Sequence, residues 1–182
     1  MKKVVTPFKL FIALFIASFS SAMAIDAAGE KENLIADFER AKAYSIEYLE
    51  AMPADGFTYK PTEDIRSFAQ QFLHLAGANY FFTSTITGTD NPTAGIEFEK
   101  LDEYQSKAAC TKAVAESYNY VIETLKRMTN EQLTESIKMF GQFEMTKAIG
   151  FGKAFEHGAH HRGQTTIYLR LKGVTPPQEK LF

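Results

Sequence analysis

Phe155-Glu156-His157-Gly158-Ala159-His160-His161-Arg162-Gly163-Gln164 is the most informative stretch of this chain. It contains three of the four histidines of the protein. In an α-helix, side chains at positions i and i+4 lie one turn apart on the same face. A helix through this stretch therefore places His157 and His161 side by side, where both imidazoles can point at one spot.

The flanking residues predict this helix. We expect it to run from about Thr146 to Lys172, because Gly173 and then the pair Pro176-Pro177 form a strong stop signal.

The fourth histidine, His74, lies in a second predicted helix, which we expect to begin at Pro61 or Thr62 and to end near Thr85. The small Gly77 and Ala78 on its face leave room beside the imidazole, either for a pocket or for tight helix packing. If the two helices are neighbours, His74 completes a site of three nitrogens with His157 and His161. Three imidazoles leave one coordination position open, which is typical of a catalytic rather than a structural metal.

Apolar periodicity predicts four principal helices in all. The other two span residues 30–52 and a segment that ends at Met128, and a long loop is expected from Thr87 to about Glu103. Thr129-Asn130-Glu131-Gln132 fits a capping box that starts a short turn of helix. Residues 137–143 are expected to form an extended connection, and a strand in a mixed fold is the less supported alternative. The fold class predicted is all-α, a four-helix bundle that is antiparallel by default.

The composition is that of an ordinary globular protein. The chain has 182 residues, of which 45% are hydrophobic and 23% charged, and its formal net charge is -2. This charge balance gives no sign of a nucleic-acid surface. Cys110 is the only cysteine, so no internal disulfide can form, and we expect it to be a small buried core residue. Neither a Ser-His-Asp set nor a glycine-rich phosphate loop is visible.

The first 24 residues predict a signal peptide. Lys2-Lys3 form a positive region, residues 10–19 an apolar run, and Ala22-Met23-Ala24 the small-x-small pattern of a cleavage site. We therefore expect one mature domain, residues 25–182, that is periplasmic or secreted and has no stable membrane association after cleavage. The alternative is a retained N-terminal anchor, although the apolar run is short for a membrane span.

Several of these motifs together resemble the DinB-like family, which is unrelated to the DNA polymerase of that name. The run from His157 to Gln164, with Tyr168-Leu169-Arg170 and Gly173-Val174-Thr175-Pro176-Pro177 behind it, is similar to the last helix of the family. Lys60-Pro61, Ser67-Phe68 and His74 resemble its second helix. The likeness covers the chain from about Glu30 onward.

The resemblance implies a four-helix bundle in a mirror variant of the up-and-down topology. It also implies a divalent metal ion, most often zinc or nickel, held here by His74, His157 and His161. Characterised relatives include thiol S-transferases that use bacillithiol or mycothiol and a mycothiol-dependent maleylpyruvate isomerase. These relatives act in the cytoplasm, so the export pattern of this chain weighs against thiol transfer specifically.

Other polar residues near the histidine pair have more than one interpretation. His160 lies about 100° around the helix from His161, so we expect it to be a surface residue or to contact a metal-binding side chain without binding the metal itself. A metal-binding pair of His157 and His160, at i and i+3, is the alternative. Gln164 and Tyr168 continue the ligand face and either orient a bound molecule or pack in the bundle. Arg162 points away and is expected to form an ion pair. Glu144 and Glu156 are the nearest carboxylates in sequence, but we assign neither as a general base.

Two functional hypotheses follow. In the first, the protein is a metal-dependent transferase or hydrolase whose cation activates a bound water or thiol on a small-molecule substrate. In the second, it is a non-catalytic metal- or ligand-binding bundle that works through an oligomer interface, for example as a homodimer. Because metal binding needs neutral imidazoles, affinity should fall as the pH drops through the ordinary histidine range, near a pKa of about 6.5.

Overall fold

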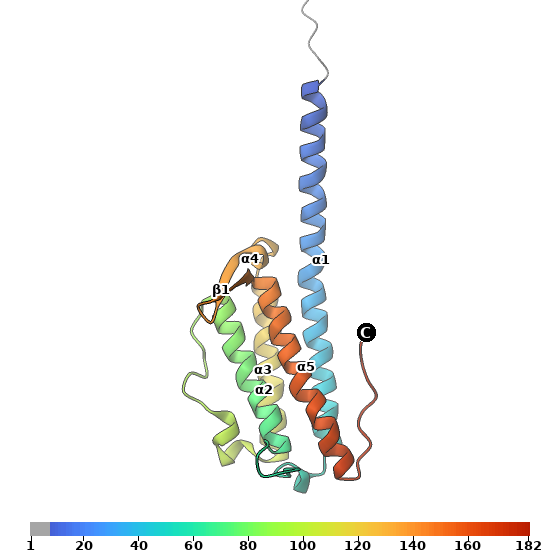
Figure 1. The fold of residues 1–182 in the computed structure, drawn as a ribbon, viewed down its shortest axis with the longest axis vertical. Helices are drawn as coiled ribbons and strands as arrows, with labels where there is room; N and C mark the ends of the chain where they lie inside the picture. Colours follow the sequence, from blue (N-terminus) through green and yellow to red (C-terminus); the bar gives the residue numbers. More distant parts are fainter. Residues whose placement is uncertain (1–7) are drawn as a thin grey trace, which may run out of the picture.

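Four long helices form a bundle in the computed structural model, which describes the backbone of residues 8–182 and the side chains of residues 29–182 (Figure 1). The long helices are α1 (Phe8–Ala51), α2 (Phe68–Thr87), α3 (Lys107–Arg127) and α5 (Lys147–Leu171). Short elements join them: the 3-10 turns η1 (Ala54–Gly56), η2 (Phe98–Lys100) and η3 (Asp102–Tyr104), the helix α4 (Asn130–Thr134), and the strands β1 (Ser136–Met139) and β2 (Phe143–Thr146). The predicted four-helix bundle with a long loop between its second and third helices is confirmed.

The order of the helices around the bundle differs from their order in the chain. Helix α1 packs against α3 and α5, and α2 packs against the same two helices, so α1 and α2 lie diagonally opposite. The loop of residues 88–106 carries the chain back along the bundle, and α2 and α3 consequently run in the same direction (Figure 1). The contact of Cys110 with the Ala69 carbonyl and that of Tyr120 with Ser84 show this parallel pairing. The all-antiparallel default is therefore wrong for this pair of helices.

Helix α2 begins later than the sequence signals around Pro61 suggested. Ser67 is the N-cap: its hydroxyl accepts from the Gln70 amide, and the Gln70 side chain accepts from the Ser67 amide. This reciprocal capping box satisfies two amide groups that a helix start leaves unpaired. Residues 61–66 form turns instead, and the Arg66 carbonyl accepts a hydrogen bond from the Tyr168 hydroxyl at 2.7 Å. The prediction that the helix starts at Pro61 or Thr62 is wrong, whereas the expected helix from Thr146 is confirmed, with Thr146 as the N-cap of α5.

The segment between α3 and α5 combines a helical turn and a hairpin. The predicted capping box at Thr129 and Gln132 is present and starts α4. Strands β1 and β2 then pair antiparallel with Met139 opposite Phe143, so the predicted extended connection is a β-hairpin. The hairpin lies at one end of the bundle, beside the C-terminal end of α2 (Figure 1).

Close contact between α5 and α2 involves a glycine. A Cβ atom at Gly150 would lie 3.0 Å from Ile86 of α2, so a larger side chain there would require Ile86 to shift. A Cβ atom at Gly158 would lie 3.4 Å from the Tyr118 hydroxyl of α3, which is an ordinary van der Waals distance. The absence of a side chain at Gly150 lets α5 lie close to α2, the helix that carries His74.

The N-terminal part of α1 extends beyond the other helices (Figure 1). Within the part of the chain that the structure describes, no helix has both the length and the apolar character required to cross a membrane. The predicted signal peptide, residues 1–24, falls outside the residues whose side chains are described, and its cleavage stays a prediction. Cys110 is fully buried, as expected, and burial raises the pKa of its thiol to about 12.

Candidate metal centre

Three histidines from two antiparallel helices meet in the middle of the bundle. His74 comes from α2, and His157 and His161 come from successive turns of α5. One ring nitrogen of each residue lies within 4.8 Å of the corresponding nitrogens of the other two. The ring centroids of His74 and His161 are 4.6 Å apart, and those of His157 and His161 are 4.5 Å apart. The expected convergence of these side chains is therefore observed.

A hydrogen-bonded chain fixes the orientation of His161. The Tyr168 hydroxyl donates its only proton to the Arg66 carbonyl, so it accepts from the Gln71 side-chain amide at 3.2 Å. The Gln71 oxygen then faces His161 Nδ1 at 2.8 Å and accepts a hydrogen bond from it. This assignment leaves the Nε2 lone pair of His161 available to a ligand. Tyr168 therefore acts through Gln71 and does not contact the cluster itself.

Glu99 orients the ring of His74 through a hydrogen bond to Nδ1, as Gln71 orients the ring of His161. Its carboxylate lies 3.1 Å from His74 Nδ1 and 2.5 Å from the Arg66 guanidinium. Burial alone raises the pKa of Glu99, but the hydrogen bonds from Arg66 and His74 outweigh it and lower the pKa. Arg66 Nη2 also lies 3.2 Å from His74 Nδ1, but an ionised carboxylate has no proton to donate, so the contact with Glu99 requires the proton on Nδ1. His74 Nδ1 therefore donates to Glu99, and Nε2 is left free. A carboxylate or amide oxygen behind a histidine is the arrangement that orients metal ligands in proteins.

The donor set fits a borderline divalent cation. Zinc and nickel both favour imidazole nitrogen, and a zinc–nitrogen bond is about 2.1 Å long. Two nitrogens bound to one ion are thus at most about 4.2 Å apart. Three nitrogens around one tetrahedral ion are about 3.4 Å apart, so from separations of up to 4.8 Å each ring needs to move inward by less than about 1 Å. His161 is buried, and His74 and His157 are half-buried and line grooves that open to solvent.

The environment favours neutral imidazoles at two of the three positions. Burial, together with the positive charge that neighbouring histidines carry when protonated, lowers the pKa of His157 to about 4 and that of His161 to about 3. Both values lie below the ordinary value of 6.5. These two imidazoles therefore remain neutral, and able to bind a metal ion, at lower pH than the ordinary histidine pKa led us to expect from the sequence.

The metal-free protein should lose stability on acidification. Between about pH 6.5 and pH 4, histidines in the unfolded chain bind protons that His157 and His161 reject in the folded state, so the unfolding free energy falls as the pH falls. One histidine contributes at most about 1.4 kcal/mol per unit of pH in this window. Urea unfolding of the stripped protein at several pH values measures the slope. His161→Asn should show a smaller slope than the parent, and equal slopes would contradict this prediction.

His160 lies outside the cluster. Its side chain is exposed, its ring lies edge-on to that of His161 with centroids 5.0 Å apart, and its Nε2 lies 2.7 Å from the Gln164 amide nitrogen. It does not belong to the group of convergent nitrogens. Gln164 is thus turned toward His160 and not toward the cluster. Arg162 is buried and stacks on the Tyr44 ring at 4.7 Å, and among the residues whose side chains are described it does not form the expected ion pair.

The carboxylates near the histidine pair in sequence are not those near it in space. Glu144 is exposed on β2 opposite Lys138, and Glu156 is exposed and paired with Lys153 at 2.8 Å. Glu99 is the carboxylate at the site, and sequence reasoning missed it. The available signal was the long loop between the second and third helices, because such loops often cover functional sites.

Two grooves open beside the histidines. The first, which we call the loop groove, has a volume of about 590 Å³; it lies between α2 and the 88–106 loop and includes His74, Gly77, Ala78 and Glu99. The small Gly77 and Ala78 therefore line a groove, which is the first of the two expectations, a pocket or tight helix packing. The second, the hairpin groove, has a volume of about 490 Å³ and is lined by Phe82, Met139, Phe140, Phe143, Met145, Lys153, Glu156, His157 and His160. His157, Phe82 and Phe140 line both grooves.

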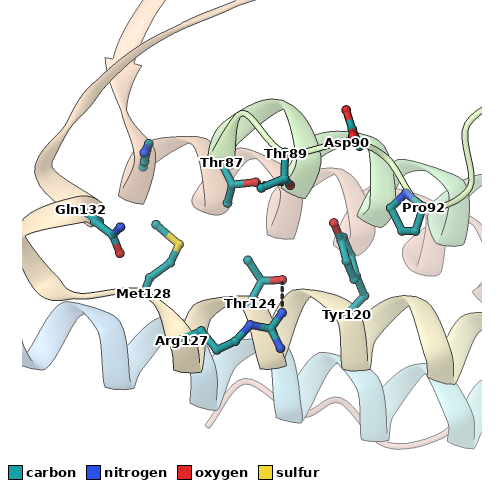
Figure 2. Close-up of a pocket in the computed structure, with 10 residues that line it drawn as sticks. Thr87, Thr89, Asp90, Pro92, Tyr120, Thr124, Arg127, Met128 and Gln132 are labelled. Atoms are coloured by element: carbon teal, nitrogen blue, oxygen red, sulfur yellow. Dashed lines mark hydrogen bonds between the residues drawn. The ribbon is translucent and has the colours of Figure 1, made fainter.

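A further cavity of about 440 Å³ lies where α2 and α3 end (Figure 2). Figure 2 shows Tyr120 and Thr124 projecting from α3 toward the segment that carries Thr87 and Thr89, whereas Arg127 lies along α3 and donates a hydrogen bond to Thr124 at 3.4 Å. None of the histidines lines this cavity, so it is separate from the candidate metal centre.

Known proteins share this fold. YjoA of Bacillus subtilis strain 168, an uncharacterized protein, is 24% identical over 151 residues, which cover 80% of this chain and 93% of YjoA. Its crystal structure, that of a DinB-like protein, aligns with a TM-score of 0.61 at 22% identity and covers 82% of this chain and 96% of that chain. A DinB-like protein from Bacillus cereus ATCC 10987 aligns with a TM-score of 0.70 at 17% identity, covering 82% and 97%.

A third structure carries a functional description. YfiT from Bacillus subtilis has been described as a probable metal-dependent hydrolase with an unusual four-helix bundle topology. It aligns with a TM-score of 0.58 at 17% identity and covers 79% of this chain and 87% of that chain. Identities this low establish a common fold only. The model of the DinB family, however, matches residues 26–181, and this protein therefore belongs to the DinB family.

Proposed function

We propose that this protein is a metal-dependent enzyme, a hydrolase or transferase, that acts on a small molecule. One divalent cation, zinc or nickel, is held by His74, His157 and His161. The observation that carries the proposal is the convergence of three ring nitrogens beside two grooves, with a hydrogen-bond acceptor behind two of the rings. Membership of the DinB family and the description of YfiT as a probable metal-dependent hydrolase support it.

Each residue of the site has a distinct task in this proposal. The three imidazoles bind the cation and leave a position open, because the group has three members among the residues whose side chains are described. Glu99 and Gln71 hold the rings of His74 and His161 in the tautomer that presents Nε2. A cation bound there supplies a Lewis acid that lowers the pKa of a coordinated water or thiol.

The open position and the adjoining grooves favour an enzyme over a non-catalytic bundle. A cation that serves only to stabilise a fold is normally enclosed by four protein ligands. Here the loop groove and the hairpin groove meet at His157, and each has a volume within the range of about 300–1,000 Å³ usual for small-molecule sites.

Activity assays test the proposal. Stripped, zinc-loaded and nickel-loaded protein should be assayed on a panel of small esters, amides and thiol conjugates. We expect turnover that requires the metal and is lost in His161→Ala. Arg170→Ala is the matched control, because it removes an exposed side chain of α5 that lines neither groove. A protein that binds metal through the three histidines but turns over no member of the panel would favour the non-catalytic alternative.

A further inference from the structure

An aromatic side chain stands in a strained position at the edge of the histidine cluster. Phe140 has a φ of 52°, in the left-handed region that glycine and asparagine tolerate and bulky residues avoid. Gly141 follows it in the hairpin turn with a φ of 71°. The side chain is nevertheless 58% exposed, so burial does not account for an aromatic residue here. Strained residues of this kind cluster at ligand-binding sites.

The ring of Phe140 belongs to an aromatic wall that reaches the candidate metal centre. It stacks on Phe81 with ring centroids 6.0 Å apart and meets Phe82 edge-on at 6.2 Å. The Phe82 ring in turn lies 5.5 Å from that of His157. Phe140 thus forms part of the wall between the loop groove and the hairpin groove, and both grooves include His157.

The hairpin groove is suited to an apolar and uncharged group. Five of its nine lining residues are Phe or Met, and Phe143 is 54% exposed on the hairpin. Its two charged residues, Lys153 and Glu156, pair with each other at 2.8 Å and leave the rim without net charge. Methionine side chains adapt to apolar ligands of varied shape. The groove is too small to seat a folded protein partner, whose stable interfaces bury about 800 Å² on each side.

We infer that the hairpin groove binds an uncharged apolar group of the substrate, such as an aromatic ring, while the reacting group lies at the histidines. Phe140 is the residue that selects for this group. The inference rests on the proposed function, because it takes the reacting group to be held at the metal. It adds the chemical class of the substrate: a small molecule with a polar reacting group and an adjoining apolar substituent.

Two metal-binding probes test the inference. Acetohydroxamic acid and phenylacetohydroxamic acid share a chelating group and differ by a phenyl ring. Calorimetric titration of the zinc-loaded protein should show phenylacetohydroxamic acid binding at least about tenfold more tightly, because an apolar pocket discriminates by this much or more between ligands that differ in apolar size. In Phe140→Asn the difference between the two probes should shrink to about twofold or less. Asparagine tolerates the left-handed turn, so the variant should fold.

Phe182→Asn is the matched control, since Phe182 is fully exposed at the C-terminus, on the other side of the bundle from β1 (Figure 1). It should keep the full preference for the phenyl probe. The methyl signals of Met139 and Met145 in the parent should shift with phenylacetohydroxamic acid and not with acetohydroxamic acid, which tests the groove without any variant. Equal, zinc-dependent affinities of the parent for both probes would overturn the inference and leave the proposed function standing. Failure of both probes to bind the zinc-loaded protein would contradict both the inference and the proposed function.

Discussion

His161→Ala is expected to lower zinc affinity by more than about 100-fold, whereas His160→Ala should change it by no more than about twofold. The two residues are adjacent in sequence, but only His161 belongs to the group of convergent nitrogens. Removal of a direct ligand should exceed the loss of about 10–100-fold that follows when a residue behind a ligand is removed. His160 is exposed and contacts Gln164.

Competition titration of stripped protein against a chromogenic zinc chelator measures both affinities. The pair of variants is its own control, because each removes one imidazole from the same turn of α5. Unfolding midpoints of the stripped variants should be recorded alongside, so that loss of binding is not confused with loss of fold. Equal losses of affinity in the two variants would show that the metal does not use the His157–His161 pair.

Glu99→Ala should lower zinc affinity by about 10–100-fold although Glu99 contributes no atom to the cluster. Its carboxylate accepts a hydrogen bond from His74 Nδ1 and so fixes the tautomer and the direction of the ring. Glu97→Ala is the matched control: Glu97 lies in the same loop, is exposed, and its carboxylate pairs with Lys100 instead of a histidine. We expect it to bind zinc like the parent.

The same titration measures these two variants, and nitrogen NMR of the imidazoles adds a test of the cause. In the parent, His74 should be the Nδ1-protonated tautomer, and in Glu99→Ala it should become a mixture of tautomers. A merely structural role of Glu99 would leave the tautomer unchanged. Zinc affinity like that of the parent in Glu99→Ala, or an equal loss of affinity in Glu97→Ala, would show that Glu99 has no specific role in the metal site.

The pairing of His157 with His161 could be predicted because its determinants are local, whereas the addition of His74 rested on the resemblance to the DinB-like family. The i, i+4 spacing of His157 and His161 follows from helix geometry, and Thr146 and Gly173 mark the ends of α5 in sequence. The bundle itself follows from apolar periodicity. The start of α2 was missed for a different reason: Ser67 and Gln70 form a capping box that the sequence contains, but the proline at position 61 looked like the stronger signal.

The remaining features depend on contacts between residues distant in sequence. Glu99 approaches His74 only because the 88–106 loop runs back along α2, which also makes α2 and α3 parallel. The hairpin carries no Asn-Gly or Asp-Gly pair, and its turn places Phe140 in a conformation that propensity argues against. Local preferences are overridden at these two places, and both adjoin the histidines.

The most direct test of the account is anomalous diffraction at the zinc edge from crystals of the zinc-loaded protein. We predict one strong peak among the three imidazoles, about 2.1 Å from one nitrogen each of His74, His157 and His161. No fourth protein side chain should complete the coordination, and a water or buffer ligand should face the grooves. A peak at His160, a peak enclosed by four protein ligands, or no peak at the cluster would contradict the claim that this is an open three-histidine metal site.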